Sequence, residues 1–301
     1  MAELDLVGDV RSASGHAAHS MRGIDDRWVI IQKNTFKNWV NEQLKESGHE
    51  INSLETDLCD GIKLCALLEF LQKKKIGRVV KKPINHHQFL ENVTIALRAM
   101  VADEIKLVNI GSEDIVNGNM KLILGLIWRL ILRYQIGKAS KVPPKKLMLS
   151  WLQAVIPDIH ISNFHTDWND GVALHALIEY CKPGTCPNWR QLNRKNGLDN
   201  CRNAMKLAKE HFDIPLVVTP ENFSNPDLDE LSGMTYLSYY MKMDSPGYFA
   251  TLRWAQGQIP QKKVKNFQTD WNDGSALTAL INSLGGNVSA NAKGKFATLQ
   301  D

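Results

Sequence analysis

The sequence predicts an all-α protein with two complete helical domains in tandem and part of a third. A motif of Thr-Asp, then Asp-Gly, then Leu-x-Ala-Leu occurs three times with the same internal spacing, at 56–68, 166–178 and 269–281. Its Asp-Gly pairs are 110 and 103 residues apart, which is the period of a domain rather than of a solenoid repeat. After each glycine the apolar residues recur with helical spacing, which predicts a helix with one buried face.

The two aspartates of each copy predict that a helix starts at the motif. The first aspartate is expected to cap the helix, and the second to lie in its first turn, where a carboxylate meets unpaired N–H groups. The pairs are Asp57 with Asp60, Asp167 with Asp170, and Asp270 with Asp273. Because they recur as helix starters, we prefer capping to an acid–base couple and expect no catalytic residue. A calcium loop is also rejected, since Ile178 stands where an EF-hand needs its bidentate glutamate.

The cysteines predict reduced thiols in a cytosolic protein. There are five, an odd number, without a C-x-x-C pair. A zinc site of Cys181, Cys186 and His175 would lack a second ligand pair, and Cys181 lies on the apolar stripe, so core thiols are the preferred interpretation. We expect no metal or other cofactor.

Composition limits the partners and the location. The net charge of +4 is too small to indicate nucleic acid. The amino-terminal stretch has acidic residues and no apolar centre, unlike a signal peptide. The longest apolar run, 122–132, contains Arg129 and is too short to cross a bilayer. A cytoplasmic protein without a transmembrane segment is expected.

Composition shifts and helical periods divide the chain into five parts. They are a disordered tail at 1–23, a first domain at 24–137, a linker at 138–144, a second domain at 145–245 and a partial third unit at 246–301. Helices are predicted near 26–45, 58–72, 86–102, 120–134, 145–155, 199–212 and 229–241. The third unit has no counterpart of the helices after Trp189. Leu277, Leu280 and Ile281 should therefore lack partners, so that 247–301 is loosely folded, docks on the second domain or is completed by further sequence.

Several surface features allow a structural or a functional interpretation. Two basic runs, Lys73, Lys74, Lys75, Arg78, Lys81 and Lys82, and Lys138, Lys141, Lys145 and Lys146, are either solvated loops or a steering field for an acidic partner. Trp28 either packs on its own domain or anchors a partner. In the apolar helix at 120–134, Lys121, Arg129 and Arg133 share one line with Gly125, which is either its wet edge or a partner's contact.

The repeated TDxxDGxxLxAL helix, the early helices with Trp39 and Trp151, and the NGNMKLILGLIWRLI helix resemble calponin-homology (CH) domains. The likeness covers about 24–245 and is strongest to filamins, in the 105–108 connector, DIPLVVTPEN and DELSGMTYLS. The half copy at the end resembles filamin-like proteins with three CH domains. Filamins continue into immunoglobulin-like repeats and a dimerisation end, which this sequence does not contain, so a monomer is expected.

This resemblance implies a non-enzymatic F-actin-binding module of the actin cytoskeleton that contacts the filament mainly through the first domain. The implied contact residues are Arg27, Trp28, Gln32, Lys33, Lys73, Lys74, Lys75, Arg78, Asn119, Lys121, Arg129, Lys145 and Lys146. Cationic loops would speed the encounter with acidic actin. The alternative is a protein-interaction scaffold that binds signalling proteins or microtubules instead of actin.

Overall fold

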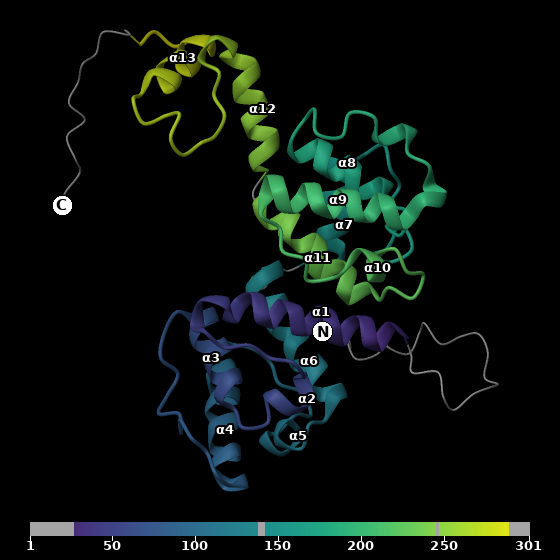
Figure 1. Ribbon diagram of the computed structural model, residues 1–301. Helices are drawn as coiled ribbons and strands as arrows, with labels where there is room; N and C mark the ends of the chain where they lie inside the picture. The colour runs from purple at the N-terminus through teal and green to yellow at the C-terminus, as the bar shows by residue number, and fades with distance from the viewer. Residues whose placement is uncertain (1–26, 138–141, 245–246, 289–301) are drawn as a thin grey trace.

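The computed structural model describes residues 27–137, 142–244 and 247–288, and these contain helices and loops but no strand. Two helical domains follow one another along the chain, and a smaller helical unit is attached to the second through α12 (Figure 1). The predicted all-α class is therefore confirmed. The predicted tail at 1–23, together with Lys138 and Lys141 of the second basic run, lies outside the described residues.

The first domain is a bundle around Trp39 and the repeated helix. Its elements are α1 (Arg27–Leu44), the short η2 (Lys45–Ser47), α2 (Leu54–Asp57), α3 (Ile62–Gln72), α4 (His86–Ala102), α5 (Ser112–Val116), α6 (Met120–Leu130) and the π-helical η3 (Ile131–Ile136). Trp39 of α1, Leu64 of α3 and Ile127 of α6 are fully buried. α6 also buries most of its other apolar residues, as its nearly unbroken apolar sequence predicts.

The second domain repeats this plan with an aromatic core. Its elements are α7 (Pro144–Val155), α8 (Val172–Cys181), η4 (Trp189–Gln191), η5 (Arg194–Asn196), α9 (Gly197–Phe212), α10 (Pro220–Phe223) and α11 (Glu230–Met243). Phe223, Tyr236 and Tyr240 pack edge to face, with ring centroids 5.4 and 5.8 Å apart. Such pairs add to the free energy gained by burying the rings.

The third unit consists of α12 (Tyr248–Gln258), η6 (Pro260–Lys262) and α13 (Ser275–Ser283) around a small core of its own. Its first helix docks on the second domain, where Arg253 Nη1 donates to Tyr180 O at 2.7 Å and the guanidinium lies 4.4 Å from the Tyr180 ring centroid. Leu277 and Ile281 of α13 are 48% and 38% exposed, as expected for residues without partners. Leu280 differs from the expectation, because it packs on the small core.

The repeated helix begins later than predicted, and its aspartates have other roles. α3, α8 and α13 start after the motif glycine, which turns the chain at φ of +74°, +72° and +71°. The second aspartate precedes the first turn: Asp60, Asp170 and Asp273 each accept a hydrogen bond of 2.9 Å from the backbone N–H two residues later. Placing these three inside the first turn was wrong, because the left-handed glycine has to come before the helix.

The first aspartate of the motif closes the preceding loop and does not cap the helix. Asp57 Oδ2 accepts the backbone N–H groups of Asn52 and Ser53, at 2.6 and 3.1 Å. Asp167 and Asp270 bind the equivalent loops in the same way. Burial acts to raise the pKa of Asp167, but the hydrogen bonds from Ser162 and Asn163 outweigh it and lower the pKa. The predicted capping role of Asp57, Asp167 and Asp270 was therefore wrong.

A buried asparagine completes the turn in both full domains. Asn200 Nδ2 donates to Asp170 O at 2.8 Å and to Asn193 O at 3.0 Å, and Asn92 binds Asp60 O and Val80 O in the first domain. A Cβ on Gly171 would lie 2.7 Å from the Asn200 Cβ and 2.7 Å from the Cys201 backbone nitrogen. The turn therefore needs glycine both for its φ and for the close approach of α9.

We predict that Gly171→Ala lowers the free energy of unfolding by about 2 kcal/mol or more, because left-handed strain adds to a collision with backbone. Gly184→Ala is the matched control, since Gly184 has φ +86° but a Cβ there would meet nothing within 4 Å. It should cost only the strain, about 1 kcal/mol. Urea unfolding of the full chain followed by circular dichroism measures both; equal losses would contradict a role for the close approach.

Candidate functional site

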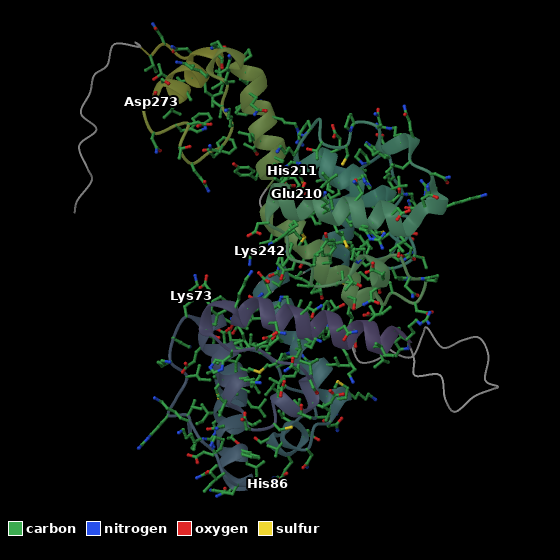
Figure 2. The ribbon with its side chains drawn as sticks, in the orientation of Figure 1. Lys73, His86, Glu210, His211, Lys242 and Asp273 are labelled. Carbon is green, nitrogen blue, oxygen red and sulfur yellow. The ribbon has the colours of Figure 1, made fainter. Side chains whose placement is uncertain are left out.

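The predicted contact residues do not form one continuous patch. Lys73 follows the end of α3 and lies near the carboxyl end of α1, whereas Arg27 and Trp28 are at the opposite end of that helix (Figure 2). Arg129 of α6, by contrast, faces the same hollow as Pro144 and Leu147 of α7. The structure therefore brings the predicted contact on α6 close to the start of α7. The predicted contacts at the two ends of α1 lie apart from each other.

The start of α1 exposes apolar side chains beside cations. Trp28 and Ile30 both leave a large part of their surface in solvent, and Arg27 is exposed next to them. Lys33 is held by an ion pair with Glu55. Burial acts to raise the pKa of Glu55, but hydrogen bonds from Lys33 and Ser53 outweigh it and lower the pKa.

Gln32 lies in the contact between the two domains. It is 7% exposed, and its Nε2 donates to Asp229 Oδ1 at the start of α11 over 3.0 Å. Asn38 of α1 also reaches the second domain, where its side chain donates to Val217 O at 3.1 Å. Helix α1 therefore packs against the second domain, as its position between the domains shows (Figure 1), and this contact buries Gln32.

The helices that form the domain contact also carry buried polar groups without partners. Thr35 Oγ1 of α1, Gln135 Nε2 of η3 and Tyr239 OH of α11 are buried without a hydrogen-bond partner among the described residues. Each such group costs about 1–3 kcal/mol of desolvation. Burial also raises the pKa of Asp229, although Ser232 and Gln32 donate to its carboxylate. We call the arrangement with α1 packed on α11 closed, and one with this contact broken open. The unsatisfied groups and the raised pKa of Asp229 make the closed arrangement less stable than a fully hydrogen-bonded contact would be.

The basic loop at 73–78 is mainly exposed. Lys73 ends α3 at φ +52°, and its N–H donates to Glu69 O and Phe70 O. Lys75 forms a 2.6 Å ion pair with Glu69, while Lys74 and Arg78 are exposed and form no ion pair within the described part of the chain. The loop thus presents cations that an acidic partner can bind at little desolvation cost.

Asn119 and the predicted lysines of α6 and α7 also lie at the surface. Asn119 precedes α6 with its side chain exposed, and Lys121 and Lys146 are exposed without an ion pair in the described ranges. Lys145 pairs with Glu230 Oε1 at 2.8 Å. Arg133 of the predicted wet edge pairs with Asp103 at 3.0 Å, so Lys121 and Arg129 are the cations of that edge without an ion pair in the described ranges.

Two exposed apolar residues were missed by the sequence analysis. Ile84 is 84% exposed, and its N–H is held by Gln88 Oε1 at 2.8 Å. Val108 is exposed in the 105–110 connector, whereas Ile105 of the same connector is buried. A signal for Ile84 existed, because a bulky aliphatic residue follows Pro83 in a polar loop.

The cysteines and His175 agree with a core role. Burial raises the pKa of Cys65 and of Cys201 to about 12, so these thiols stay protonated. Both ring nitrogens of His175 are in hydrogen bonds, with Gly171 O at 2.9 Å and Asn203 Oδ1 at 3.0 Å. Among the described residues, no group of three or more His, Cys, Asp and Glu side chains is placed to hold a metal ion.

Comparison with known proteins identifies the repeated domain. The model of the calponin homology (CH) domain matches residues 30–136, 142–245 and 249–299. The chain belongs to the calponin-homology family. We refer to the first two segments as CH1 and CH2. The third match agrees with the half copy of the motif at the end of the sequence.

The similar proteins include filamins and an alpha-actinin, each several times longer than the matched region. Filamin-A of Drosophila melanogaster is 44% identical over 228 residues, and filamin-C of Rattus norvegicus is 44% identical over 229, each across 72% of this chain. Alpha-actinin-3 of Mus musculus is 35% identical over 223 residues. The matched region spans 10% and 8% of the two filamins and 25% of alpha-actinin-3.

The fold also resembles a solved structure. The crystal structure of the actin-crosslinking core of Schizosaccharomyces pombe fimbrin matches with a TM-score of 0.55 at 20% identity, over 86% of this chain and 61% of that one. This similarity supports the fold alone. Within the described residues no helix is both long and apolar enough to cross a membrane.

We predict that Gln32→Ala raises the ratio of open to closed arrangements about tenfold, because a hydrogen bond to a charged group contributes about 1.5–3 kcal/mol. Small-angle X-ray scattering and hydrogen exchange of α1 and α11 measure the change. Asn34→Ala, on the same helix, is the control, because no hydrogen bond of its side chain is present among the described residues. An unchanged ratio in the Gln32 variant would contradict a closing role for this bond.

A pH dependence follows from Asp229. Burial raises its pKa above the ordinary 3.8 in this structure, and Gln32 of α1 contributes to covering it, so the closed form should bind a proton more tightly than the open form. The closed population should therefore increase as the pH falls from neutrality towards that ordinary value. Asp229→Asn keeps an acceptor for Gln32 and for the helix start, so it should favour closure at pH 7 and remove the dependence. The same scattering measurement decides this, and a pH response retained in the Asn variant would assign it to another group.

Proposed function

We propose that this chain is a non-enzymatic module that binds F-actin mainly through CH1, and that it resides in the cytoplasm at the actin cytoskeleton. The observation that carries the proposal is that CH1 leaves cations and bulky apolar side chains exposed together. Trp28 and Ile30 lie beside Arg27 at the start of α1, and Ile84 follows the basic run that begins at Lys73. The similarity to filamins and to an alpha-actinin supports this assignment.

The exposed groups have complementary roles in such a contact. Actin is acidic, so the cations of the basic loop would accelerate the encounter, with a strong dependence on salt. Trp28 and Ile84 would hold the complex once water is excluded, because large apolar and aromatic side chains dominate most interfaces. We assign Arg27, Lys33, Asn119, Lys121 and Arg129 to the surrounding polar contact.

CH2 would limit access to this surface and tune the affinity. Gln32 is buried against Asp229 in the closed arrangement, so a filament can use all of α1 only after the domains separate. The affinity is then reduced by the fraction of molecules that are open. The start of α7, with Lys145 and Lys146, would add a smaller contact from CH2. We propose that the chain acts as a monomer.

We predict that replacing Lys73, Lys74 and Lys75 together with Glu weakens binding to F-actin about tenfold or more at low salt, because attraction becomes repulsion. Co-sedimentation of the full chain with F-actin over a salt series measures this. The matched control changes Lys262, Lys263 and Lys265 to Glu; these three lysines are exposed in the third unit, and Lys263 has φ +49°, close to the +52° of Lys73.

Two outcomes distinguish an error in the proposed partner from an error in the proposed contact site. No binding by the unmodified chain at low salt would reject actin and favour the scaffold that binds signalling proteins or microtubules. Binding that both triple variants weaken equally would keep actin as the partner but remove the basic loop as a specific contact.

A further inference from the structure

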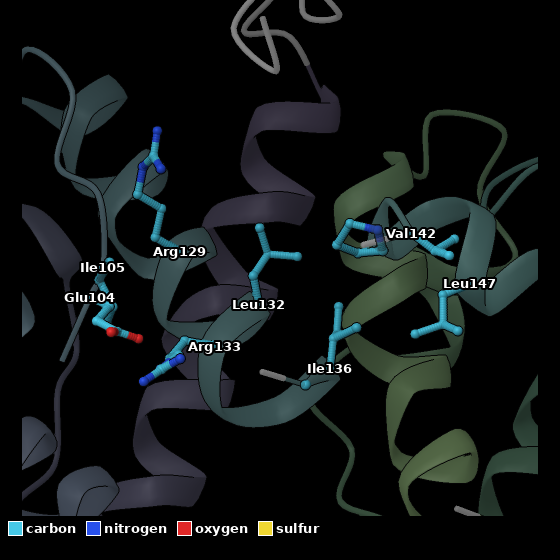
Figure 3. A pocket seen from close by; sticks show the side chains of 10 residues that line it. Glu104, Ile105, Arg129, Leu132, Arg133, Ile136, Val142 and Leu147 are labelled. Atoms are coloured by element: carbon cyan, nitrogen blue, oxygen red, sulfur yellow. The ribbon is translucent and has the colours of Figure 1, made fainter. Parts of the chain in front are cut away.

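A hollow of about 260 Å³ lies where CH1 meets CH2, next to the pair of predicted contacts at Arg129 and α7. Its CH1 wall includes Leu132 and Ile136, and its CH2 wall includes Val142 and Leu147 (Figure 3). Val142 and Leu147 are 38% and 36% exposed. Aliphatic side chains of both domains thus face solvent across one small opening.

Two arginines line the hollow, and only one of them forms an ion pair with a described residue. Arg133 is paired with Asp103 at 3.0 Å, and that hydrogen bond, with Glu104 adding to it, raises the pKa of Arg133. Arg129 has no ion pair with any described residue, and its guanidinium points away from Glu104 at the edge of the hollow (Figure 3). Lys146, exposed and likewise without an ion pair there, follows Pro144 of the lining. Glu104 also lines the hollow and has no ion pair with a described residue, so its carboxylate offsets one of these two cations and the opening keeps a small net positive charge.

We propose that this hollow binds an acidic peptide segment of a partner protein, with one aliphatic side chain between Leu132 and Leu147 and a neighbouring carboxylate on Arg129. The hollow is slightly smaller than the roughly 300–1,000 Å³ usual for small-molecule sites, and its aliphatic walls suit one apolar side chain. The charge favours an acidic segment, because a guanidinium binds a carboxylate through two parallel hydrogen bonds. The site lies apart from the exposed start of α1 and does not require actin, but it shares Arg129 with the proposed filament contact.

Because the walls belong to both domains, the peptide would bind the closed arrangement. A ligand that prefers one arrangement shifts the population towards it, and the effect is reciprocal. Occupation of the hollow would therefore keep Gln32 buried against Asp229. Conversely, separation of the domains would release the peptide.

The test is an NMR titration of the full chain, without actin, with an acetylated and amidated pentapeptide of sequence Glu-Asp-Leu-Asp-Glu. Saturable shifts are expected for backbone amides of 129–137 and 142–149. Arg129→Gln and Leu147→Ser should each weaken binding about fivefold, the effect of losing one partly exposed ion pair or apolar contact. Lys121→Gln, the same loss of one positive charge two turns earlier on α6, should change it less than twofold.

Two further arms make the result decisive. A peptide with Lys in place of each acidic residue should not bind. Gln32→Ala should weaken the acidic peptide by the factor by which it lowers the closed population. The proposal is overturned if the acidic peptide causes no saturable shifts, if Arg129→Gln and Lys121→Gln behave alike, if the Lys peptide binds equally, or if opening the domains leaves affinity unchanged.

Discussion

The Asp-Gly turn at the head of each core helix is the local structure on which the rest of the molecule depends. The glycine turns the chain at positive φ, and the preceding aspartate binds the first free N–H of the helix, as Asp170 does for Val172. A buried asparagine from the following long helix then binds the carbonyl of that aspartate, as Asn200 does. The turn thus fixes where the core helix starts and how closely the next helix packs. CH1 and CH2 have the same architecture because both satisfy this constraint.

The third unit contains the same turn without the long helix that packs over it in CH1 and CH2. α13 begins directly after Gly274, which has the same φ, and the Ser275 N–H donates to Asp273 as in the other two copies. The face of α8 that is fully buried in CH2, at Leu174, Leu177 and Ile178, corresponds to a largely exposed face of α13. Local chemistry is therefore sufficient to place the helix, but burial of its apolar stripe needs further helices. Docking of α12 on CH2, through Arg253 and the buried Asp244, which accepts from the Phe249 N–H, anchors the unit instead.

The contact between CH1 and CH2 links the fold to the proposed function. It uses the side of α1 that carries Gln32, and it includes the buried Asp229 carboxylate. Buried polar atoms without partners make such a contact weak compared with an apolar core. A weak contact can be opened by a partner whose preference for one arrangement is modest. The same geometry brings Arg129 and Leu147 to one hollow, so the two proposed sites would respond to closure in opposite directions.

Sequence alone determined the helical class, the three copies of the motif and most helix positions, because a 3.6-residue apolar period and an Asp-Gly turn are local properties of the chain. It gave α4 its bounds of His86–Ala102 and α6 its buried faces. Only the tertiary structure decided the roles of Asp57 and Asp167, since these depend on which loop folds back onto the carboxylate. It also decided that Gln32 is buried, that Arg129 lines a hollow with α7, and that Lys73 lies near the carboxyl end of α1, the helix that has Trp28 at its start. The exposure of a side chain and its distance from the other domain depend on contacts between residues far apart in the sequence. The periodicity of a single helix therefore cannot predict them.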